Sequence, residues 1–370
     1  MIPVWEPVLD GNERRYVLDC LETNWISSLG SYITRFEETF ARWCGVPHGV
    51  ACSSCTTGLH LALVGLGIGP GDEVIIPDFT LIVSASTVIE AGARPVLVDA
   101  DPKTWGLDPD KVEEKIGPRT RAIMPVHMYG HPCDMPRICE IARRRRLFVI
   151  EDCAEAHGAE VGGRRVGSFG DAACFSFYGN KILTTGEGGM VLCSDGKLAE
   201  EMRLLRNQAF EQPRFVHRRI GFNYRLTNVQ AAIGLAQVEK VDEKVEKKRE
   251  IARWYAEAFA KVEDVELPAE APGAKNVYWM YGVKLGDSFR RGRDGVMAAL
   301  KERGVETRAF FCPMHRQPVF QGTDSRFPDV SGSYPVSDDL WKRGLYLPSG
   351  LGLTRSQVEE VAAKLAECRG

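Results

Sequence analysis

The sequence predicts an α/β protein with a mostly parallel, mixed sheet in a three-layer large domain, followed by a smaller α+β domain. Short β-branched runs alternate with helical patterns over the first two-thirds of the 370 residues. The predicted strands are almost continuously apolar, as in sheets that helices cover on both faces. This pattern changes after Gly170, and the smaller domain is expected to begin near residue 238. Since a domain holds roughly 100–200 residues, a chain of this length suits two domains.

The elements of the large domain follow one another in a regular order. Residues 49–52 (GVAC) predict a strand, and a helix over 56–66 follows from its apolar stripe at Leu59, Ala62, Leu63 and Leu66. Further strands are expected within GPGDEVIIP, RPVLVD, RAIMPV and LFVIED, and the helices between them over 80–90, 108–116 and 134–145. After Gly170 the segments ACFSFY and GGMVLCS predict two strands with little helix between them.

The smaller domain is connected by a long helix over 228–257, whose highly charged second half (EKVDEKVEKKRE) suits a solvated face. We expect the large domain to span 1–237 and the small domain 238–370. The remaining elements are a strand near 277–285, a helix near 295–303, a Pro- and Gly-rich loop over 313–335 and a closing helix over 354–367.

Charge and composition point away from nucleic acids and membranes. The net charge of -3 and the pI near 6.2 give no reason to expect either partner. No segment reaches about 18 consecutive apolar residues, and the start, MIPVWEPVLDGNERR, lacks the pattern of a signal peptide. The 11 scattered cysteines favour reduced thiols in the cytoplasm over a disulfide framework. Cys52 and Cys55 form a C-x-x-C, but without a second pair it favours buried or loop thiols over a metal or redox site.

Polar residues stand where three of the predicted strands end, which is where open α/β sheets bind ligands. Ser54 to Thr57 lie between a strand and its helix, so the free N–H groups of the helix start suit an anion. An ordinary N-cap by Ser54 or Thr56 is the alternative. Asp152 ends the strand LFVIED, and with Glu155 and His157 it offers a metal site as a rival interpretation.

Ser176 and Lys181 form the third group. Lys181 is the only basic residue between Ala172 and Met190, and a glycine-rich loop suited to close backbone approach follows it. A buried lysine amine can hold an aldehyde as an imine, and a carboxylate can keep a pyridine nitrogen protonated. The pair Lys181 and Asp152 therefore predicts pyridoxal phosphate as the cofactor.

Over nearly its whole length the sequence resembles the nucleotide-sugar aminotransferases of the DegT/StrS branch, which have the aspartate aminotransferase fold (fold type I). The segments that carry the resemblance are TNWISS, GLHLAL, GPGDEVIIP, VHMYGHPCDM, VIEDCAEAHG, FSFYGNKILTTGEGGM, RLTNVQAAIGLAQ and FFCPMHRQP. Within the branch, HMYGHPCDM, EDCAEAHG and GNK-TTGEGGM are more similar to members that act on GDP-linked sugars than to those that act on UDP- or dTDP-linked sugars.

The resemblance implies a role for each matching residue. Lys181 is the imine-forming lysine that also moves the proton, and Asp152 the partner of the pyridine nitrogen. Ala154 lies against the ring face and Glu155 near the ring hydroxyl. The phosphate is contacted by Ser54, Cys55, Thr56 and Ser176 and, from the neighbouring subunit, by Asn228, which makes a homodimer necessary.

Two positions depart from the family pattern, and the substrate contacts are less defined. Cys55 stands where the family usually has glycine, and Leu81 where an aromatic ring commonly stacks on the cofactor. Substrate contacts are expected from Trp25, Ser27, Arg249 and His315, although Arg249 also suits the solvated KKRE face and His315 a loop histidine. Lys181 argues against the sugar dehydratases of this family, which have histidine in its place.

The expected activity is transfer of an amino group from L-glutamate to a nucleotide-linked 4-keto-6-deoxy sugar. The sugar is expected to carry GDP, and a UDP- or dTDP-linked keto-hexose is the alternative within the same class. A regulatory or binding protein without turnover and a metal hydrolase using Asp152, Glu155 and His157 are alternatives from other classes.

Overall fold

The large sheet of the computed structural model, which describes residues 1–370, has seven strands in the order β1-β9-β8-β5-β4-β2-β3. Neighbouring strands are parallel from β8 to β3, and β9 runs antiparallel to both β8 and β1. The strands are β1 (His48–Cys52), β2 (Glu73–Pro77), β3 (Arg94–Val98), β4 (Thr120–Ile123), β5 (Phe148–Asp152), β8 (Ala172–Ser176) and β9 (Gly189–Cys193).

Helices cover both faces of this sheet, because successive strand residues point to opposite sides and nearly all of them are apolar. In β9, Met190 and Leu192 join one apolar cluster and Val191 joins another. The helices of one side are α3 (Cys55–Gly65), α4 (Val83–Glu90) and α7 (Gly196–Arg206). Those of the other side are α2 (Ser31–Cys44), α5 (Pro109–Lys115), α6 (Met135–Arg145) and α8 (Asn228–Val238), with α1 (Glu13–Glu22) packed on α8. The predicted three-layer arrangement is confirmed.

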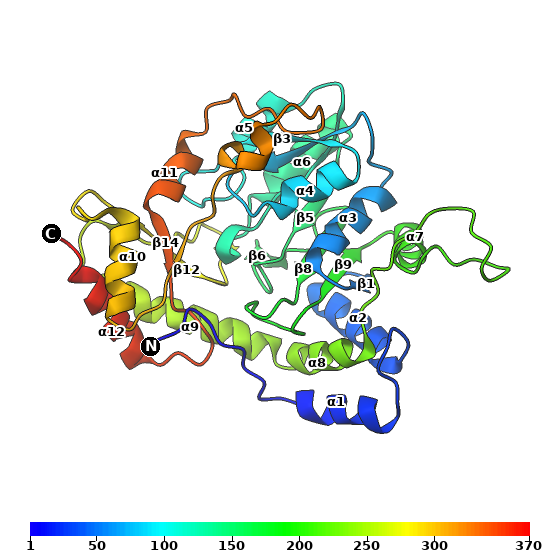
Figure 1. The fold of residues 1–370 in the computed structure, drawn as a ribbon, viewed down its shortest axis with the longest axis horizontal. Helices are drawn as coiled ribbons and strands as arrows, with labels where there is room; N and C mark the ends of the chain where they lie inside the picture. The colour runs from blue at the N-terminus through cyan, green and yellow to red at the C-terminus, as the bar shows by residue number, and fades with distance from the viewer.

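A second, antiparallel sheet forms the C-terminal α+β part, in the order β10-β12-β14-β13. Its strands are β10 (Val265–Glu266), β12 (Tyr281–Leu285), β13 (Arg308–Ala309) and β14 (Gly344–Leu347). Its helices are α9 (Val241–Phe259), α10 (Gly292–Glu302), α11 (Pro335–Arg343) and α12 (Arg355–Ala366). The start of the chain lies on this part, where Ile2 bridges Val305 and the Ser349 N–H donates to the Val4 carbonyl at 2.9 Å. Both chain ends therefore lie near α10 and α12 (Figure 1). The domain boundary after residue 237 stays a prediction.

Several elements differ from the expectation. The helix predicted over 228–257 is two helices, because the backbone at Lys240, with φ -118° and ψ 17°, leaves the helical conformation between α8 and α9. The loop over 313–335 contains two 3-10 turns, Met314–Arg316 and Pro318–Gln321. A small sheet of β11 (Ala274–Lys275), β6 (Glu160–Val161) and β7 (Arg164–Arg165) and a further 3-10 turn at Met128–Gly130 complete the fold. None of the helices has the length and apolar character needed to cross a bilayer.

Candidate active site

Asp152 lies at the carboxyl end of β5 with only 6% of its surface exposed. Its Oδ1 accepts a hydrogen bond from the Ala154 N–H at 3.0 Å, and its Oδ2 accepts none from the chain. Burial raises the pKa of Asp152, while the Ala154 N–H and the charge of Lys181 lower it. A buried carboxylate with one free oxygen can accept the N–H of a protonated ring nitrogen, so this site fits the pyridine of the predicted cofactor.

Lys181 lies in the loop after β8, where its side chain is 10% exposed. Its Nζ lies 3.9 Å from Glu155 Oε1 and 3.6 Å from the ring centroid of Trp279. The Trp279 indole N–H donates to the Asn180 carbonyl at 2.8 Å, which ties the lysine loop to the segment before β12. Burial lowers the pKa of Lys181, and the carboxylates of Glu155 and Asp152 raise it. A lysine in these surroundings gives up its proton more readily than a surface lysine and is a better nucleophile.

The start of α3 offers an anion site. Ser54 is the N-cap of α3 and forms a capping box with Thr57. Its hydroxyl therefore acts as an ordinary N-cap, which was the alternative interpretation. As first-turn residues, Cys55 and Thr56 have N–H groups with no acceptor inside the helix, and these groups suit a phosphate. Cys55 stands where the family usually has glycine, and its side chain is buried.

Gly189 explains how this helix start comes so close to the sheet. It pairs with Cys52 on one side and Ser176 on the other. A side chain at Gly189 would lie 2.3 Å from the carbonyl carbon and oxygen of Ser54, so only glycine fits there. Ser176, 7% exposed, is thereby placed beside the first turn of α3. The sequence indicated close backbone approach in this loop without singling out Gly189.

The comparisons with known proteins identify the family. The model of the DegT/DnrJ/EryC1/StrS aminotransferase family matches residues 7–366. The chain belongs to this family. The GDP-perosamine synthase of Caulobacter vibrioides is 50% identical over 98% of this chain and 97% of its own length, and that of Escherichia coli O157:H7 is 42% identical over 99% and 98%. The crystal structure of S. venezuelae DesV in complex with a ketimine intermediate has a TM-score of 0.90 at 37% identity, covering 96% of this chain and 94% of that chain.

Membership in the DegT/DnrJ/EryC1/StrS family confirms the predicted fold type, the aminotransferase activity and pyridoxal phosphate as the cofactor. The roles of single residues stay predictions, and the structure says where each residue lies. It brings Asp152, Ala154, Glu155 and Lys181 together, and Ser54, Cys55, Thr56 and Ser176 around the start of α3. Leu81 lies between β2 and α4 and is 48% exposed, as an aliphatic side chain at the edge of a ligand site would be.

Asn228 is hydrogen-bonded within its own chain, and its contact with the phosphate of a neighbouring subunit stays a prediction. Its side chain is 1% exposed and hydrogen-bonded within its own chain, accepting from the Tyr32 N–H at 3.1 Å and donating to the Trp25 carbonyl at 2.7 Å. These bonds use both the oxygen and the nitrogen of the amide within one chain. Its backbone N–H also donates to the Ser27 carbonyl at 2.6 Å, so Asn228 fixes the exposed segment that carries Trp25 and Ser27.

Two other predicted substrate contacts are occupied by protein partners. The Arg249 guanidinium donates to Glu270 at 2.5 Å and to the Asn276 carbonyl at 2.5 Å. His315 is 9% exposed, with Nδ1 2.7 Å from Asp78 Oδ2 and Nε2 3.2 Å from Asp338 Oδ1. The alternative stated for His315, a satisfied loop histidine, matches this geometry. Arg249, with a side chain 22% exposed, is paired within the protein and does not lie on a solvated face.

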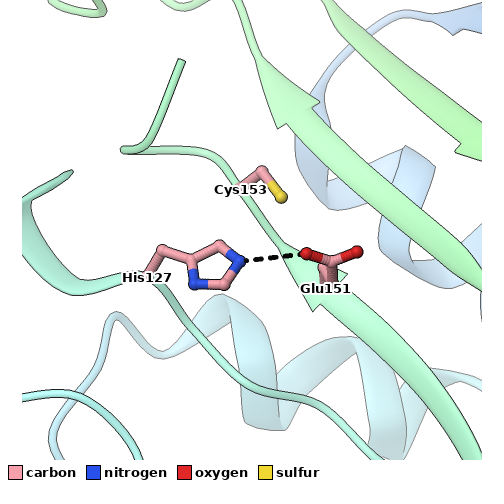
Figure 2. Close-up of side chains that lie close together, drawn as sticks. All are labelled: His127, Glu151 and Cys153. Atoms are coloured by element: carbon pink, nitrogen blue, oxygen red, sulfur yellow. Dashed lines mark hydrogen bonds and ion pairs between the residues drawn. The ribbon is translucent and has the colours of Figure 1, made fainter. Parts of the chain in front are cut away.

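A buried polar cluster lies next to Asp152 without being a ligand site. His127, Glu151 and Cys153 place potential metal ligands within 4.8 Å of one another, and Figure 2 shows the His127 ring directed at Glu151. The His127 Nδ1 accepts from the Cys133 N–H at 3.0 Å, and its Nε2 lies 3.3 Å from Glu151. The same carboxylate accepts from three backbone N–H groups, those of Gly167, Phe169 and Gly170, at 2.7–2.8 Å. With these bonds made, the cluster holds the segment 167–170 against β5, next to Asp152. The rival set of Asp152, Glu155 and His157 does not form a group of close ligands.

His157 predicts a specific loss of stability in acid. It is fully buried among Phe40, Phe175 and Phe177, and neither ring nitrogen has a hydrogen-bond partner. Burial, with the charge of Lys181, lowers the pKa of His157 to about 3. The unfolded chain takes up this proton below about pH 6.5 and the folded chain does not. His157 therefore does not reduce the free energy of unfolding above that pH. Between pH 7 and pH 5 it lowers the free energy of unfolding by about 2 kcal/mol.

Urea unfolding at pH 8, 7, 6 and 5 measures this loss. His157→Phe, which keeps a ring of similar size, should unfold with a free energy that falls about 2 kcal/mol less between pH 7 and pH 5 than in the wild type. His217→Phe, at an exposed position, is the control and should keep the wild-type slope. An unchanged slope in His157→Phe would exclude His157 as the source.

Proposed function

We propose that this chain transfers the amino group of L-glutamate to GDP-4-keto-6-deoxymannose, giving 2-oxoglutarate and GDP-perosamine. The observation that supports amino-group transfer is the buried group of Lys181, Asp152 and Glu155 near the carboxyl ends of β5 and β8. The choice of sugar is supported by the GDP-perosamine synthases to which the chain is 41–50% identical over at least 98% of its length.

Different residues of the site would bind different parts of pyridoxal phosphate. Asp152 Oδ2 would accept the pyridine N–H, the N–H groups of Cys55 and Thr56 with the Ser176 hydroxyl would hold the phosphate, and Lys181 would bind the aldehyde carbon. When bound, the cofactor supplies an electron sink for the carbon next to the nitrogen and carries the amino group between the two substrates. Lys181 would remove the proton from the α-carbon of glutamate, hold it at Nζ and give it up again within the same half-reaction. The same residues would serve the second half-reaction, in which the amine reaches C4 of the sugar.

A homodimer in the cytoplasm is part of the proposal. Trp25, Ile26 and Leu29 are 54%, 51% and 67% exposed in one short segment. The loop after α7, which extends away from the body of the molecule in Figure 1, leaves Phe215 71% and Ile220 91% exposed. Large apolar side chains exposed in groups favour burial in an interface. All 11 cysteines are free, which supports a reducing compartment.

A panel of nucleotide-linked keto sugars tests the proposal. The purified chain, loaded with pyridoxal phosphate, is incubated with L-glutamate and a GDP-, UDP- or dTDP-linked 4-keto-6-deoxy sugar, and the product is identified by mass and NMR. The proposal expects a 4-amino sugar from the GDP substrate. A product formed only from a UDP or dTDP substrate would overturn the sugar assignment. No product and no 2-oxoglutarate with any acceptor would overturn the transfer itself.

A further inference from the structure

The free amine of Lys181 rests between two groups that come from distant parts of the chain. Glu155, in the turn after β5, lies 3.9 Å from the Nζ, and the Trp279 ring centroid, just before β12, lies 3.6 Å from it. An aromatic face and a carboxylate both favour the charged form of an amine. The structure therefore provides a resting place for Lys181 as an ammonium ion, although its role as a base requires the neutral amine.

Glu155 is held so that one oxygen faces the lysine. Its Oε2 accepts a hydrogen bond from the Tyr129 N–H at 2.8 Å, and the residue is 5% exposed. Lys181 is the one cation within 4.0 Å of this carboxylate. Two opposite charges buried together with few other hydrogen bonds lose much hydration, whereas a carboxylic acid beside a neutral amine does not. The energies of the charged and the neutral pair are thus brought close together.

We propose that Glu155 shares the proton of Lys181 and releases the amine to act as the base. In this step the Nζ–H bond of the ammonium breaks and an O–H bond forms at Glu155 Oε1. The products are a neutral amine and a carboxylic acid, and the net charge of the pair is zero before and after the transfer. The reverse transfer restores the ammonium ion when the amine has finished its work. This inference rests on the proposed function and names a group that serves its proton transfers.

The acid–base properties of the two groups agree with this exchange. Burial raises the pKa of Glu155 to about 7, against the opposing effects of Lys181 and the Tyr129 N–H. Burial lowers the pKa of Lys181, against the opposing effects of the Glu155 and Asp152 carboxylates. Since 3.9 Å is an ion-pair distance, the flexible lysine side chain has to move by about 1 Å to form the hydrogen bond along which the proton passes.

Chemical labelling of the full chain freed of cofactor measures the exchange directly. Formaldehyde with cyanoborohydride methylates neutral amines, and peptide mass spectrometry gives the extent at Lys181 from pH 5.5 to 9.5. Glu155→Gln keeps the shape of the side chain and removes its proton-accepting oxygen. Glu160→Gln, which changes a carboxylate that pairs with Lys275 at 3.0 Å, is the matched control. Lys248, 4% exposed with no carboxylate within 4.0 Å, is an internal reference in each sample.

The proposal expects Glu155→Gln to lower the labelling midpoint of Lys181 by about one pH unit, which is about tenfold faster labelling on the acid side. The midpoint of Lys248 and both midpoints in Glu160→Gln should stay at wild-type values. In the loaded enzyme, Glu155→Gln should also slow the single-turnover release of 2-oxoglutarate from glutamate by at least about tenfold at pH 7.

Two results would overturn the proposal. An unchanged Lys181 midpoint in Glu155→Gln would show that the carboxylate does not hold the proton. A shifted midpoint with an unchanged single-turnover rate would show an ion pair that takes no part in the reaction. Failure of the proposed function has a different signature, because the wild-type chain would then release no 2-oxoglutarate at all. A labelling shift in such a chain would still support proton sharing between the two side chains.

Discussion

Replacing Lys181 with alanine is expected to lower the rate of transamination by more than about 10³-fold. The variant loses the amine that binds the aldehyde and the base that moves the α-proton, and no other amine lies at that place. Glu155, left at 5% exposure without its cation, will be protonated near neutral pH and cannot replace a lysine base. Release of 2-oxoglutarate from glutamate, followed over a single turnover, gives the rate.

Lys275→Ala is the control for this substitution. Lys275 pairs with Glu160 at 3.0 Å in the small sheet, so its loss should leave the rate within about twofold of the wild type. Free ammonium or methylamine should restore part of the activity of Lys181→Ala, because a small amine can occupy the vacated space. A Lys181→Ala enzyme that keeps a tenth of the wild-type rate would contradict the role assigned to this lysine.

The strands and the positions of Asp152 and Lys181 could be predicted because their signals are local. An apolar run that ends in a carboxylate specifies a buried strand and the side chain just beyond it, as in β5 and Asp152. Lys181 stands out because the segment around it has no other basic residue. Parallel pairing of β5 with β8 then places the two segments side by side.

The parts that could not be predicted depend on contacts between distant residues. The break between α8 and α9 has no glycine or proline to mark it. It allows Ile251, Tyr255 and Phe259 of α9 to pack on the second sheet, while α8 stays buried against α2. Trp279 reaches Lys181 and Asp78 reaches His315 across about a hundred residues or more, and no pattern in one sequence indicates either contact.

The contacts that Asn228 makes within its own chain could not be predicted from its segment. Its segment is recognisable, but the asparagine side chain turns back to Tyr32 and Trp25 of its own chain. Gly30 allows this packing, since a side chain there would lie 2.3 Å from the Asn228 side chain. These hydrogen bonds depend on how the first thirty residues fold over α8. The sequence pattern of α8 does not indicate that arrangement.

Replacing Asp152 with asparagine is expected to slow the same half-reaction by about 10²- to 10³-fold, while the chain stays folded. The amide has the shape of the carboxylate and can still accept the Ala154 N–H, but it carries no charge to keep a ring nitrogen protonated. An unprotonated ring withdraws electrons poorly, so the carbanion-like charge at the reacting carbon is less stabilised. The cofactor content after dialysis, measured by absorbance and mass, separates this effect from weaker binding.

Asp171→Asn is the matched control, because Asp171 accepts the Val149 N–H at 2.8 Å near the opposite end of β5. Removing that charge should cost at most about 1 kcal/mol of stability and leave the rate unchanged, since the group lies away from the ring site. If Asp152→Asn kept full cofactor and a wild-type rate, the carboxylate would not be the partner of the pyridine nitrogen. If instead it lost cofactor but reacted normally when saturated, Asp152 would serve binding alone. The expected result, a slow enzyme with its cofactor in place, requires the buried charge itself.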